Sequence, residues 1–368
     1  MSLPIRIAID TRDLQKAFSG THTYLQSLIH AWQNIESKTF EYILLGSQSK
    51  VYTGKQKWKK AAEHLQFLVW KQIRLPLLVK KNQCSILFCS DYFLPFFHPG
   101  FKTVVVFHDA FFFEYPEHYN AIWLQLFKKL AIPAAFKASA IIVPSAYSKN
   151  RIRYFTGFPE KKLKVVYEAP QQIPEIISNN PHSINQPYFL HVGTLNKNKN
   201  LVRALHAFKN LIITNPSSTV CLVLAGKPSP HSALSDEKNI LDTITALQLE
   251  SRVMLTGFLD APELAKIYTN ALAYLFPSYN EGFGIPVLEA FQYGIPLLAA
   301  NNTCLPEIAA DAALYFNPFH ENEITDAMQQ ILSDAGIRKQ LIEKGFKRLE
   351  NFSWHQSALQ INAIFNAV

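Results

Sequence analysis

Two series of short apolar segments, joined by a polar linker, limit the folds open to this chain of 368 residues more than any other feature. Segments with helical periodicity lie between the apolar runs, and strands that alternate with helices form parallel sheets covered by helices on both faces. The stretch from Pro170 to Pro187 is polar, punctuated by proline and aperiodic, as interdomain linkers are. We therefore predict two doubly wound α/β domains. The expected strands are Ile5–Ile9, Tyr42–Leu45, Gln66–Val69, Ile86–Cys89, Thr103–Phe107, Ala140–Val143 and Lys164–Val166 in the first series, and Tyr188–Val192, Val220–Ala225, Val253–Thr256, Ala273–Phe276 and Pro296–Ala299 in the second.

The composition is that of a globular protein, with 48% hydrophobic and 17% charged residues. Four scattered cysteines without paired metal spacing predict reduced, buried thiols and a cytoplasmic location. The N-terminus has no long apolar core and no cleavage pattern, so we expect a first strand there rather than a signal peptide. No run of about 18 apolar residues is present, which argues against a transmembrane helix.

Basic residues gather in the first half of the chain. Residues 1–170 hold 23 lysines and arginines against 11 acidic residues, within a net charge of +8 for the whole chain. The densest basic stretch, Lys50–Lys81, also carries Trp58 and Trp70, a pattern that suits contact with anionic lipid headgroups at the inner face of a membrane. A solvated helical face is the simpler interpretation, and both stay open. No nucleic-acid recognition motif accompanies the charge, so we expect no nucleic-acid partner.

A carboxylate stands at each end of a glycine-containing loop, in Glu281-Gly-Phe-Gly-Ile-Pro-Val-Leu-Glu289. The apolar run Ala271–Phe276 before it is typical of a buried parallel strand, and Pro286 suits a first helical turn. Open α/β sheets bind ligands beyond the carboxyl ends of their strands, which is where Glu281 would lie. From spacing alone, a ligand site and an ordinary strand–helix connection with two solvated glutamates are equally open.

The residues of this loop resemble the Glu-x7-Glu signature of the retaining glycosyltransferases of family 4, which have the GT-B fold. Further segments match that family in order and spacing: Tyr188–Leu195, Leu222–Gly226, Val253–Phe258, Ala299–Glu307, His108-Asp109 and Phe352-Ser-Trp354. The resemblance implies two Rossmann-like domains that face each other across a cleft, with a C-terminal helix that crosses back to the first domain. The implied boundaries are 1–170 with 352–368 for the acceptor-side domain, 171–187 for the linker and 188–351 for the domain that binds the nucleotide sugar.

The same resemblance implies roles for several residues of the second domain. Lys199 occupies the place of the lysine that binds the donor diphosphate, where a fixed cation stabilises the leaving group. Glu289 would accept hydrogen bonds from the ribose hydroxyls, and Glu281 would hold the transferred sugar and stabilise positive charge at the reacting carbon. The other donor-binding positions that the resemblance implies are Gly20, Gly193, Phe258, Gly282, Phe283, Gly284 and Ile285.

In the first half of the chain, His108 is the implied catalytic residue, placed to orient the acceptor hydroxyl or the donor sugar. An aspartate that caps the following turn is the alternative interpretation of Asp109. Weaker candidates for contact with the acceptor are Asp10, Arg12, Asp13, Ser145 and Lys149. Since no histidine or carboxylate cluster has the spacing of a metal site, we expect no metal ion and no cofactor.

The resemblance thus implies a hexosyltransferase-type glycosyltransferase that moves a sugar from a GDP- or UDP-linked donor to a hydroxyl acceptor with retained anomeric configuration. The resemblance implies a saccharide or lipid-linked saccharide acceptor in bacterial surface polysaccharide or glycolipid synthesis, and mannose as a candidate sugar. Two positions depart from the family: Asn198 stands where an arginine is usual, and His22 where a glycine is common. Both departures touch the diphosphate site, so a non-catalytic or impaired nucleotide-sugar-binding subunit is the alternative.

Overall fold

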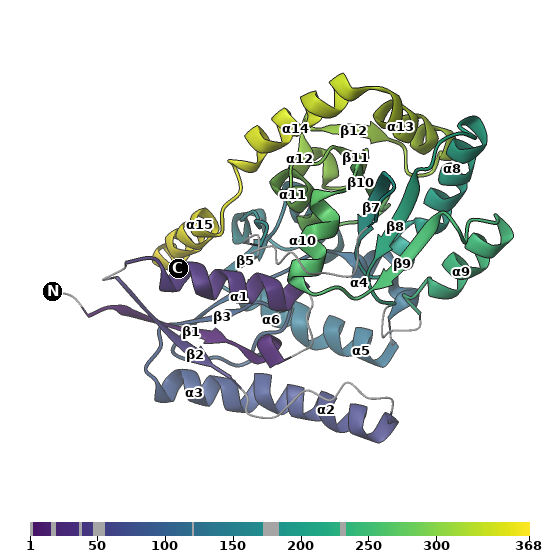
Figure 1. Ribbon diagram of the computed structural model, residues 1–368. Helices are drawn as coiled ribbons and strands as arrows, with labels where there is room; N and C mark the ends of the chain where they lie inside the picture. The colour runs from purple at the N-terminus through teal and green to yellow at the C-terminus, as the bar shows by residue number, and fades with distance from the viewer. Residues whose placement is uncertain are drawn as a thin grey trace. The chain divides into compact units, whose positions relative to one another are not determined.

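The computed structural model describes residues 3–15, 20–36, 39–46, 56–119, 121–171, 184–228 and 233–368 (Figure 1). Contacts divide the chain into two compact units. Unit 1 comprises Met1–Glu168 and Ser353–Val368, and unit 2 comprises Ala169–Phe352. Most of the expected linker, 171–187, lies outside the described residues.

Unit 1 is built on a six-stranded parallel sheet with the order β2-β1-β3-β4-β5-β6. Its central strands are continuous apolar runs and are buried along their length, as parallel strands covered on both faces must be. The strands are β1 (Ile5–Asp10), β2 (Phe40–Leu45), β3 (Ile86–Cys89), β4 (Lys102–Val106), β5 (Ala140–Val143) and β6 (Leu163–Val165). The helical segments are η1 (Arg12–Gln15), α1 (Gly20–Gln33), α2 (Lys57–Val69), η2 (Trp70–Arg74), α3 (Leu75–Lys81), α4 (Phe111–Glu114), η3 (Pro116–His118), α5 (Ala121–Leu126), η4 (Phe127–Ala131), α6 (Ile132–Lys137), α7 (Ala146–Thr156), η5 (Glu160–Lys162) and α15 (Trp354–Ala367).

One predicted strand of unit 1 is wrong. Gln66–Val69 forms the end of helix α2, which continues through the π-helical turn η2 into α3. A short apolar run has the same appearance in a buried strand and on the buried side of a helix, and only its neighbours distinguish the two. Here the preceding residues 57–65 extend the helical pattern, so the run joins a helix rather than the sheet.

The last helix of the chain, α15, completes the core of unit 1. Its residues Ala358, Ile361 and Phe365 are buried in a cluster with residues of β1, β3, β4 and α1. The ring of Phe365 lies 6.1 Å from that of Trp32 in α1, and Figure 1 shows α15 in yellow beside α1 in purple. This confirms the expected return of the C-terminal helix to the first domain.

Unit 2 contains a second six-stranded parallel sheet, with the order β12-β11-β10-β7-β8-β9. The strand Ala313–Phe316 escaped prediction because it is an edge strand of four residues, three of them only half-buried. The strands are β7 (Tyr188–Val192), β8 (Cys221–Ala225), β9 (Val253–Gly257), β10 (Ala273–Phe276), β11 (Leu297–Ala300) and β12 (Ala313–Phe316). The helical segments are η6 (Lys197–Lys199), α8 (Leu201–Thr214), α9 (Glu237–Ala246), α10 (Ala261–Thr269), α11 (Ile285–Gln292), α12 (Leu305–Ala309), α13 (Glu321–Ser333) and α14 (Ala335–Leu349).

In each unit, helices alternate along the chain with the strands of a six-stranded parallel sheet, which confirms the predicted doubly wound α/β architecture. In each unit the carboxyl ends of all strands meet at one edge of the sheet, because the strands are parallel. Among the helices of the described residues, none is long and apolar enough to cross a membrane.

Candidate functional site

In unit 2, Lys199 and Glu281 meet beyond the carboxyl ends of β7 and β10. The Lys199 ammonium donates to Oε1 of Glu281 at 2.6 Å, and both side chains are largely shielded from solvent. The same ammonium lies 5.6 Å from the centre of the Phe276 ring, at the end of β10. A lysine and a carboxylate that come from two different strand ends therefore form one charged centre.

The loop before α8 is held in place by asparagine side chains. Lys199 ends the short 3-10 turn η6, and Asn200 follows in the left-handed region with φ 57°. The Asn200 amide donates to the carbonyl oxygens of Pro277 and Pro318 at 3.1 and 2.7 Å. Asn198 donates to the carbonyl of Asn280 at 3.0 Å. Asn198 thus connects the Lys199 loop to the Glu281 loop, a role that its amide can fill and that sequence reasoning missed.

His191 is a buried member of this centre that the sequence analysis also missed. Burial, followed by the charge of Lys199, lowers the pKa of His191 to about 3, so its ring is neutral in the physiological range. Its Nδ1 lies 3.0 Å from the Leu275 carbonyl oxygen, and a neutral ring that donates there keeps Nε2 as an acceptor. A histidine within a strand looks like an ordinary core residue, so only its position next to Lys199 marks it.

Glu289 lies on α11 and is half-buried. Its Oε2 accepts a hydrogen bond from the Tyr268 hydroxyl at 2.7 Å. Burial raises the pKa of Glu289, and the bond from Tyr268 opposes that change. The ring of Tyr268 is itself stacked on that of Tyr293 at 4.9 Å, so the position of the carboxylate is fixed from behind.

The glycine loop between Glu281 and α11 is tightly packed. Gly284 has φ +91°, and a Cβ there would lie 3.1 Å from Leu305 and 3.2 Å from Phe276. Phe283 is buried and its ring packs edge-on against Phe352. The side chain of Phe283 therefore belongs to the core, and any contact from this position to a ligand would come from its backbone.

Three further predicted donor-site positions differ in how open they are. Phe258 is 54% exposed, with the Lys227 ammonium 4.8 Å above its ring. Gly193 lies where a Cβ would come 3.4 Å from Nε2 of His191 and 3.6 Å from Cε of Lys199. Gly20, in unit 1, is exposed at the start of α1.

In unit 1, both ring nitrogens of His108 face acceptor oxygens. Nε2 lies 2.8 Å from the Ser90 carbonyl oxygen, and Nδ1 lies 3.3 Å from Oε1 of Glu168. Burial lowers the pKa of His108, but the hydrogen bond to Glu168 and the charge of that carboxylate outweigh it, and the pKa is raised. The arrangement favours a protonated ring that donates on both sides.

Asp109 caps the turn that follows β4, since its Oδ1 accepts from the backbone N–H of Phe111 at 3.0 Å. Burial raises the pKa of Asp109 to about 6. The observed contact of Asp109 therefore agrees with the capping interpretation.

A buried ionic cluster lies at the carboxyl ends of β1 and β3. Lys71 contacts Oδ2 of Asp10 at 2.6 Å and also pairs with Asp91, and the indole of Trp70 donates to Oδ1 of Asp10 at 3.0 Å. Lys71 and Trp70 were expected on a basic surface and are instead almost completely buried. Lys71 can be buried because the carboxylates of Asp10 and Asp91 neutralise its charge, which would otherwise be costly to remove from water.

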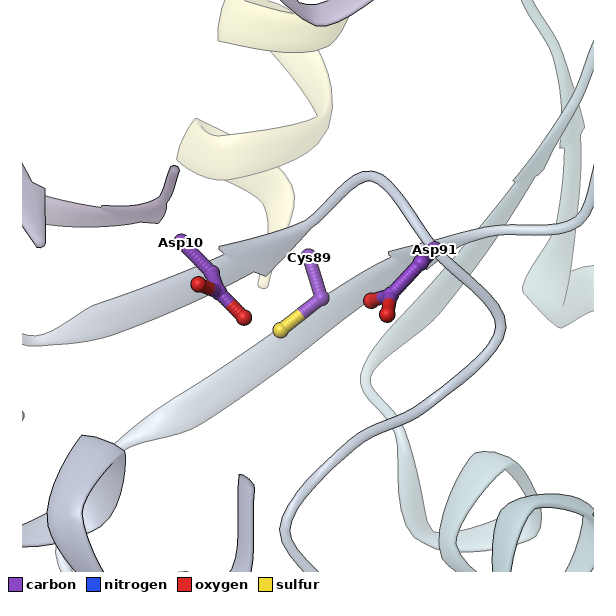
Figure 2. A group of neighbouring side chains, drawn as sticks. All are labelled: Asp10, Cys89 and Asp91. Atoms are coloured by element: carbon purple, nitrogen blue, oxygen red, sulfur yellow. The ribbon is translucent and has the colours of Figure 1, made fainter. Parts of the chain in front are cut away.

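Asp10, Asp91 and Cys89 form a group whose ligand atoms lie within 4.8 Å of one another, which is the spacing of a metal site (Figure 2). Burial raises the pKa of the Cys89 thiol well above its usual value, which disfavours the thiolate that metals bind. The Lys71 ammonium already contacts both carboxylates. The cluster therefore fits a lysine-neutralised carboxylate pair better than a set of metal ligands.

The weaker acceptor candidates have contacts within unit 1. Arg12 pairs with Glu63 at 2.6 Å, and Asp13 accepts from the Ser90 hydroxyl at 3.3 Å. Ser145 caps α7 by accepting from the backbone N–H of Ser148 at 3.0 Å, and Lys149 pairs with Glu160 at 3.1 Å.

Two family models match consecutive parts of the chain. Residues 37–169 match the model described as Glycosyltransferase Family 4, and residues 172–348 match the model of group 1 glycosyl transferases. Among curated proteins, the chain is 25% identical to the O-antigen chain mannosyltransferase B of Escherichia coli over 283 residues, which are 74% of this chain and 72% of the relative.

Solved structures share the fold over almost the whole chain. The sucrose-phosphate synthase of Thermosynechococcus elongatus matches with a TM-score of 0.77 and 17% identity, over 99% of this chain and 98% of that protein. The Anabaena protein HepE, crystallised with UDP-glucose, matches with a TM-score of 0.69 and 17% identity, over 99% of this chain and 100% of that protein. At these identities the likeness establishes the fold alone.

The family matches, the two parallel sheets and the solved neighbours agree with one another. They confirm the predicted GT-B fold and the prediction of an enzyme that transfers sugars. The chain belongs to the group 1, family 4 glycosyltransferases and is a glycosyltransferase of the hexosyltransferase type.

Proposed function

We propose that this chain transfers a hexose from a nucleoside-diphosphate sugar to a hydroxyl acceptor, with retention of the anomeric configuration, in the synthesis of a bacterial surface polysaccharide or glycolipid. The O-antigen mannosyltransferase relative supports mannose as the transferred sugar and a saccharide, free or lipid-linked, as the acceptor. GDP and UDP are the nucleotides proposed for the donor, the second because HepE was crystallised with UDP-glucose.

The observation that carries the proposal is the ion pair between Lys199 and Glu281 at the edge of the second sheet. Breaking the bond between the sugar and the diphosphate leaves negative charge on the phosphate and positive charge at the anomeric carbon. An ammonium beside the phosphate and a carboxylate beside the carbon oppose these two charges, and both act strongly in a site from which water is largely excluded. Oppositely charged groups 2.6 Å apart suit the two ends of a bond that is about to break.

The proposed step uses this separation of charge. The acceptor hydroxyl attacks the anomeric carbon on the face from which the diphosphate leaves, and the departing phosphate oxygen takes the hydroxyl proton. One carbon–oxygen bond forms, one breaks, and the proton ends on the nucleoside diphosphate, so the step needs no metal ion and no further cofactor. We assign Glu289 to the ribose hydroxyls, and Gly193 to close approach of the backbone to the diphosphate.

For His108 we propose an electrostatic role as a positively charged imidazolium, rather than the role of a general base. Acceptor oxygens at both ring nitrogens and the raised pKa favour the imidazolium, which has no free lone pair to take a proton. Its positive charge then acts electrostatically on the sugar or the acceptor. A pH profile in which activity falls as His108 loses its proton would support this role, whereas a rise would indicate a general base.

Thermal-shift measurements with UDP, GDP, ADP and dTDP and their sugars, without added metal, test the donor site. A ligand at about 100 times its Kd stabilises by roughly 2.7 kcal/mol. We expect one base to give a selective shift that is lost in both Lys199→Ala and Glu289→Ala. Transfer of the matching sugar to a saccharide acceptor in the presence of a chelator then tests the enzyme. Stabilisation without donor hydrolysis or transfer would instead favour the non-catalytic binding subunit, with Asn198 and His22 as the departures responsible.

We also propose that unit 1 contacts an anionic membrane surface through the run α2–η2–α3. Trp58, Leu65, Ile73 and Leu77 are all more than half exposed along this run. The π-helical turn inserts one residue, which keeps Leu65 and Ile73, eight positions apart, on one side. The part of the basic stretch at 50–55 lies outside the described residues.

Sedimentation with phosphatidylglycerol vesicles tests this contact. We expect binding by the whole chain and loss of binding in Trp58→Ser/Leu65→Ser, since the apolar side chains supply the buried area. Equal binding of that variant would overturn the proposal.

A further inference from the structure

A hollow of about 850 Å³ lies at the opposite edge of the first sheet from His108. Its lining includes Ser85, Lys102 and Ser139, which stand at the amino ends of β3, β4 and β5. His108 follows the carboxyl end of β4, six residues beyond Lys102, and a strand of that length spans about 20 Å. The hollow is therefore separate from the candidate catalytic residues of unit 1.

The hollow gathers positive charge from several elements. Lys80 comes from the last turn of α3, Lys102 from the start of β4 and Lys137 from the end of α6, while His98 lies in the loop between β3 and β4. None of the residues that line it is acidic. Among the described residues, no carboxylate forms an ion pair with any of the three lysines.

The negative ends of two helices offset only part of this positive charge. Lys80 and Lys137 stand at helix C-termini, each of which carries roughly half a negative charge. Three ammonium groups against two such helix ends leave a net charge of about +2 at the opening. If the lysines served only to compensate the helix ends, the net positive charge at the opening would be much smaller.

An aromatic side chain contacts one of the lining lysines. The Lys137 ammonium lies 3.7 Å from the centre of the Phe96 ring, which directs it through a cation–π contact. Phe97, next in the chain and just before His98, is 74% exposed. A charged hollow of this volume has the dimensions of a site for a small ligand rather than for a single ion.

We propose that this hollow, the Lys80–Lys102–Lys137 pocket, binds a phosphate-bearing group of about two negative charges. Lysine ammonium groups recognise phosphate as point charges, and three of them from separate elements suit a phosphate monoester or a diphosphate. Such a group is supplied by an anionic lipid headgroup or by a free phosphorylated molecule. The site is distinct from the donor diphosphate site proposed at Lys199.

Titration with inorganic pyrophosphate, followed by calorimetry at low salt, tests the pocket. The titration uses the whole chain with Lys199→Ala, so that the proposed donor site does not contribute. We expect binding that weakens at least about tenfold in Lys102→Ser/Lys137→Ser, because charged hydrogen bonds to the phosphate are lost. The matched control is Lys128→Ser/Lys129→Ser, two exposed lysines of η4 whose removal changes the net charge equally.

Vesicles of phosphatidylcholine with and without phosphatidic acid, whose headgroup is a phosphate monoester, distinguish the two sources. Loss of vesicle binding in the pocket variant, with Trp58 and Leu65 intact, indicates a lipid headgroup, whereas loss of pyrophosphate binding alone indicates a soluble ligand. The proposal is overturned if pyrophosphate does not bind, or if the pocket variant and the control variant lose affinity equally. A failure at this pocket leaves nucleotide binding at Lys199 untouched, so the two proposals fail separately.

Discussion

The carbonyl oxygen of Gly193 lies 1.9 Å from the place where a Cβ on Gly226 would stand. The two glycines follow the adjacent strands β7 and β8, and the backbone N–H of Gly193 donates to the carbonyl of Ala225 at 2.9 Å. No side chain fits between these segments. The loop that leads from Gly193 to Lys199 therefore depends on the absence of a side chain at position 226.

Gly226→Ala should displace the Gly193–Lys199 loop. Because the clash is with backbone rather than with a flexible side chain, we expect a loss of about 1–3 kcal/mol in the free energy of unfolding. Nucleotide binding should weaken as well, since Lys199 would move with the loop. Urea unfolding and thermal shift with the preferred nucleotide measure the two effects.

Gly257→Ala is the control for this experiment. Gly257 has φ +70° at the end of the neighbouring strand β9, and a Cβ there would meet no atom within 4 Å. Its replacement carries only the backbone cost, roughly 1–2 kcal/mol, and should leave nucleotide binding intact. Equal loss of nucleotide binding in both variants would show that the close approach of the two loops is unimportant.

Substitutions of Lys199 and of Glu281 should affect nucleotide binding and sugar transfer differently. Lys199→Ala removes the cation that we assign to the diphosphate, so nucleotide binding and transfer should both fall. Glu281→Gln releases the ammonium from its ion pair, so nucleoside diphosphate binding should persist or tighten while kcat falls at least about 100-fold.

Lys209→Ala, on helix α8, removes a charge from the same unit away from the pair and should change neither quantity. Calorimetry with the nucleoside diphosphate and transfer rates with the donor sugar provide the comparison. If Glu281→Gln weakens nucleotide binding as much as Lys199→Ala does, the pair acts as a structural ion pair and not as two ends of a reacting bond.

The sequence pattern predicted the strand ends at which Lys199, Glu281 and His108 lie, because apolar runs identify buried parallel strands and the next polar residues mark their carboxyl ends. The same reasoning failed for Gln66–Val69, where the three apolar residues Phe67–Val69 are half-buried at the end of a helix. Local sequence patterns predict the position of a strand well when turn residues flank the apolar run on both sides. They predict it poorly when helical residues precede the run.

Partners that are distant in the chain could not be predicted. Lys71 looked like part of a basic surface, because nothing near it in sequence indicates that Asp10 and Asp91 approach it. His191 and Asn198 acquire their roles from contacts with β10 and with the Glu281 loop, 82 or more positions away. The sheet order that brings these segments together is a property of the whole domain.

The stability of the protein should fall as the pH rises above 6.5, the ordinary pKa of histidine. In the folded state, burial lowers the pKa of His108, but Glu168 raises it more. The stabilisation by protonated His108 is complete below pH 6.5 and is lost as the pH rises through the raised pKa. Glu168→Gln should flatten this part of the curve, as measured by urea unfolding over a pH series.

Asp109 contributes to the pH dependence of stability at lower pH, and its contribution can be measured separately from that of His108. Burial raises its pKa from 3.8 to about 6, so its stabilising protonated form is present below pH 3.8 and is lost as the pH rises through 6. Asp109→Asn should remove the slope below pH 6 and leave the slope above 6.5. An unchanged curve in Glu168→Gln would refute the assignment of the upper slope to His108.

Removal of the Lys71 side-chain charge should destabilise the protein strongly. Lys71→Met leaves the buried carboxylates of Asp10 and Asp91 without their cation, and breaking a buried pair in this way costs about 3–5 kcal/mol. Urea unfolding at neutral pH measures this loss.

Two further variants separate charge from packing. Lys81→Met removes an exposed lysine ten residues further along the same helical run and should change the free energy of unfolding by no more than about 0.5 kcal/mol. The triple variant Lys71→Met/Asp10→Asn/Asp91→Asn removes all three charges, and we expect it to recover most of the stability at neutral pH because no uncompensated charge stays buried. If the triple variant is as unstable as Lys71→Met, the long side chain of Lys71 acts through its packing, and the carboxylates at the ends of β1 and β3 do not need its charge.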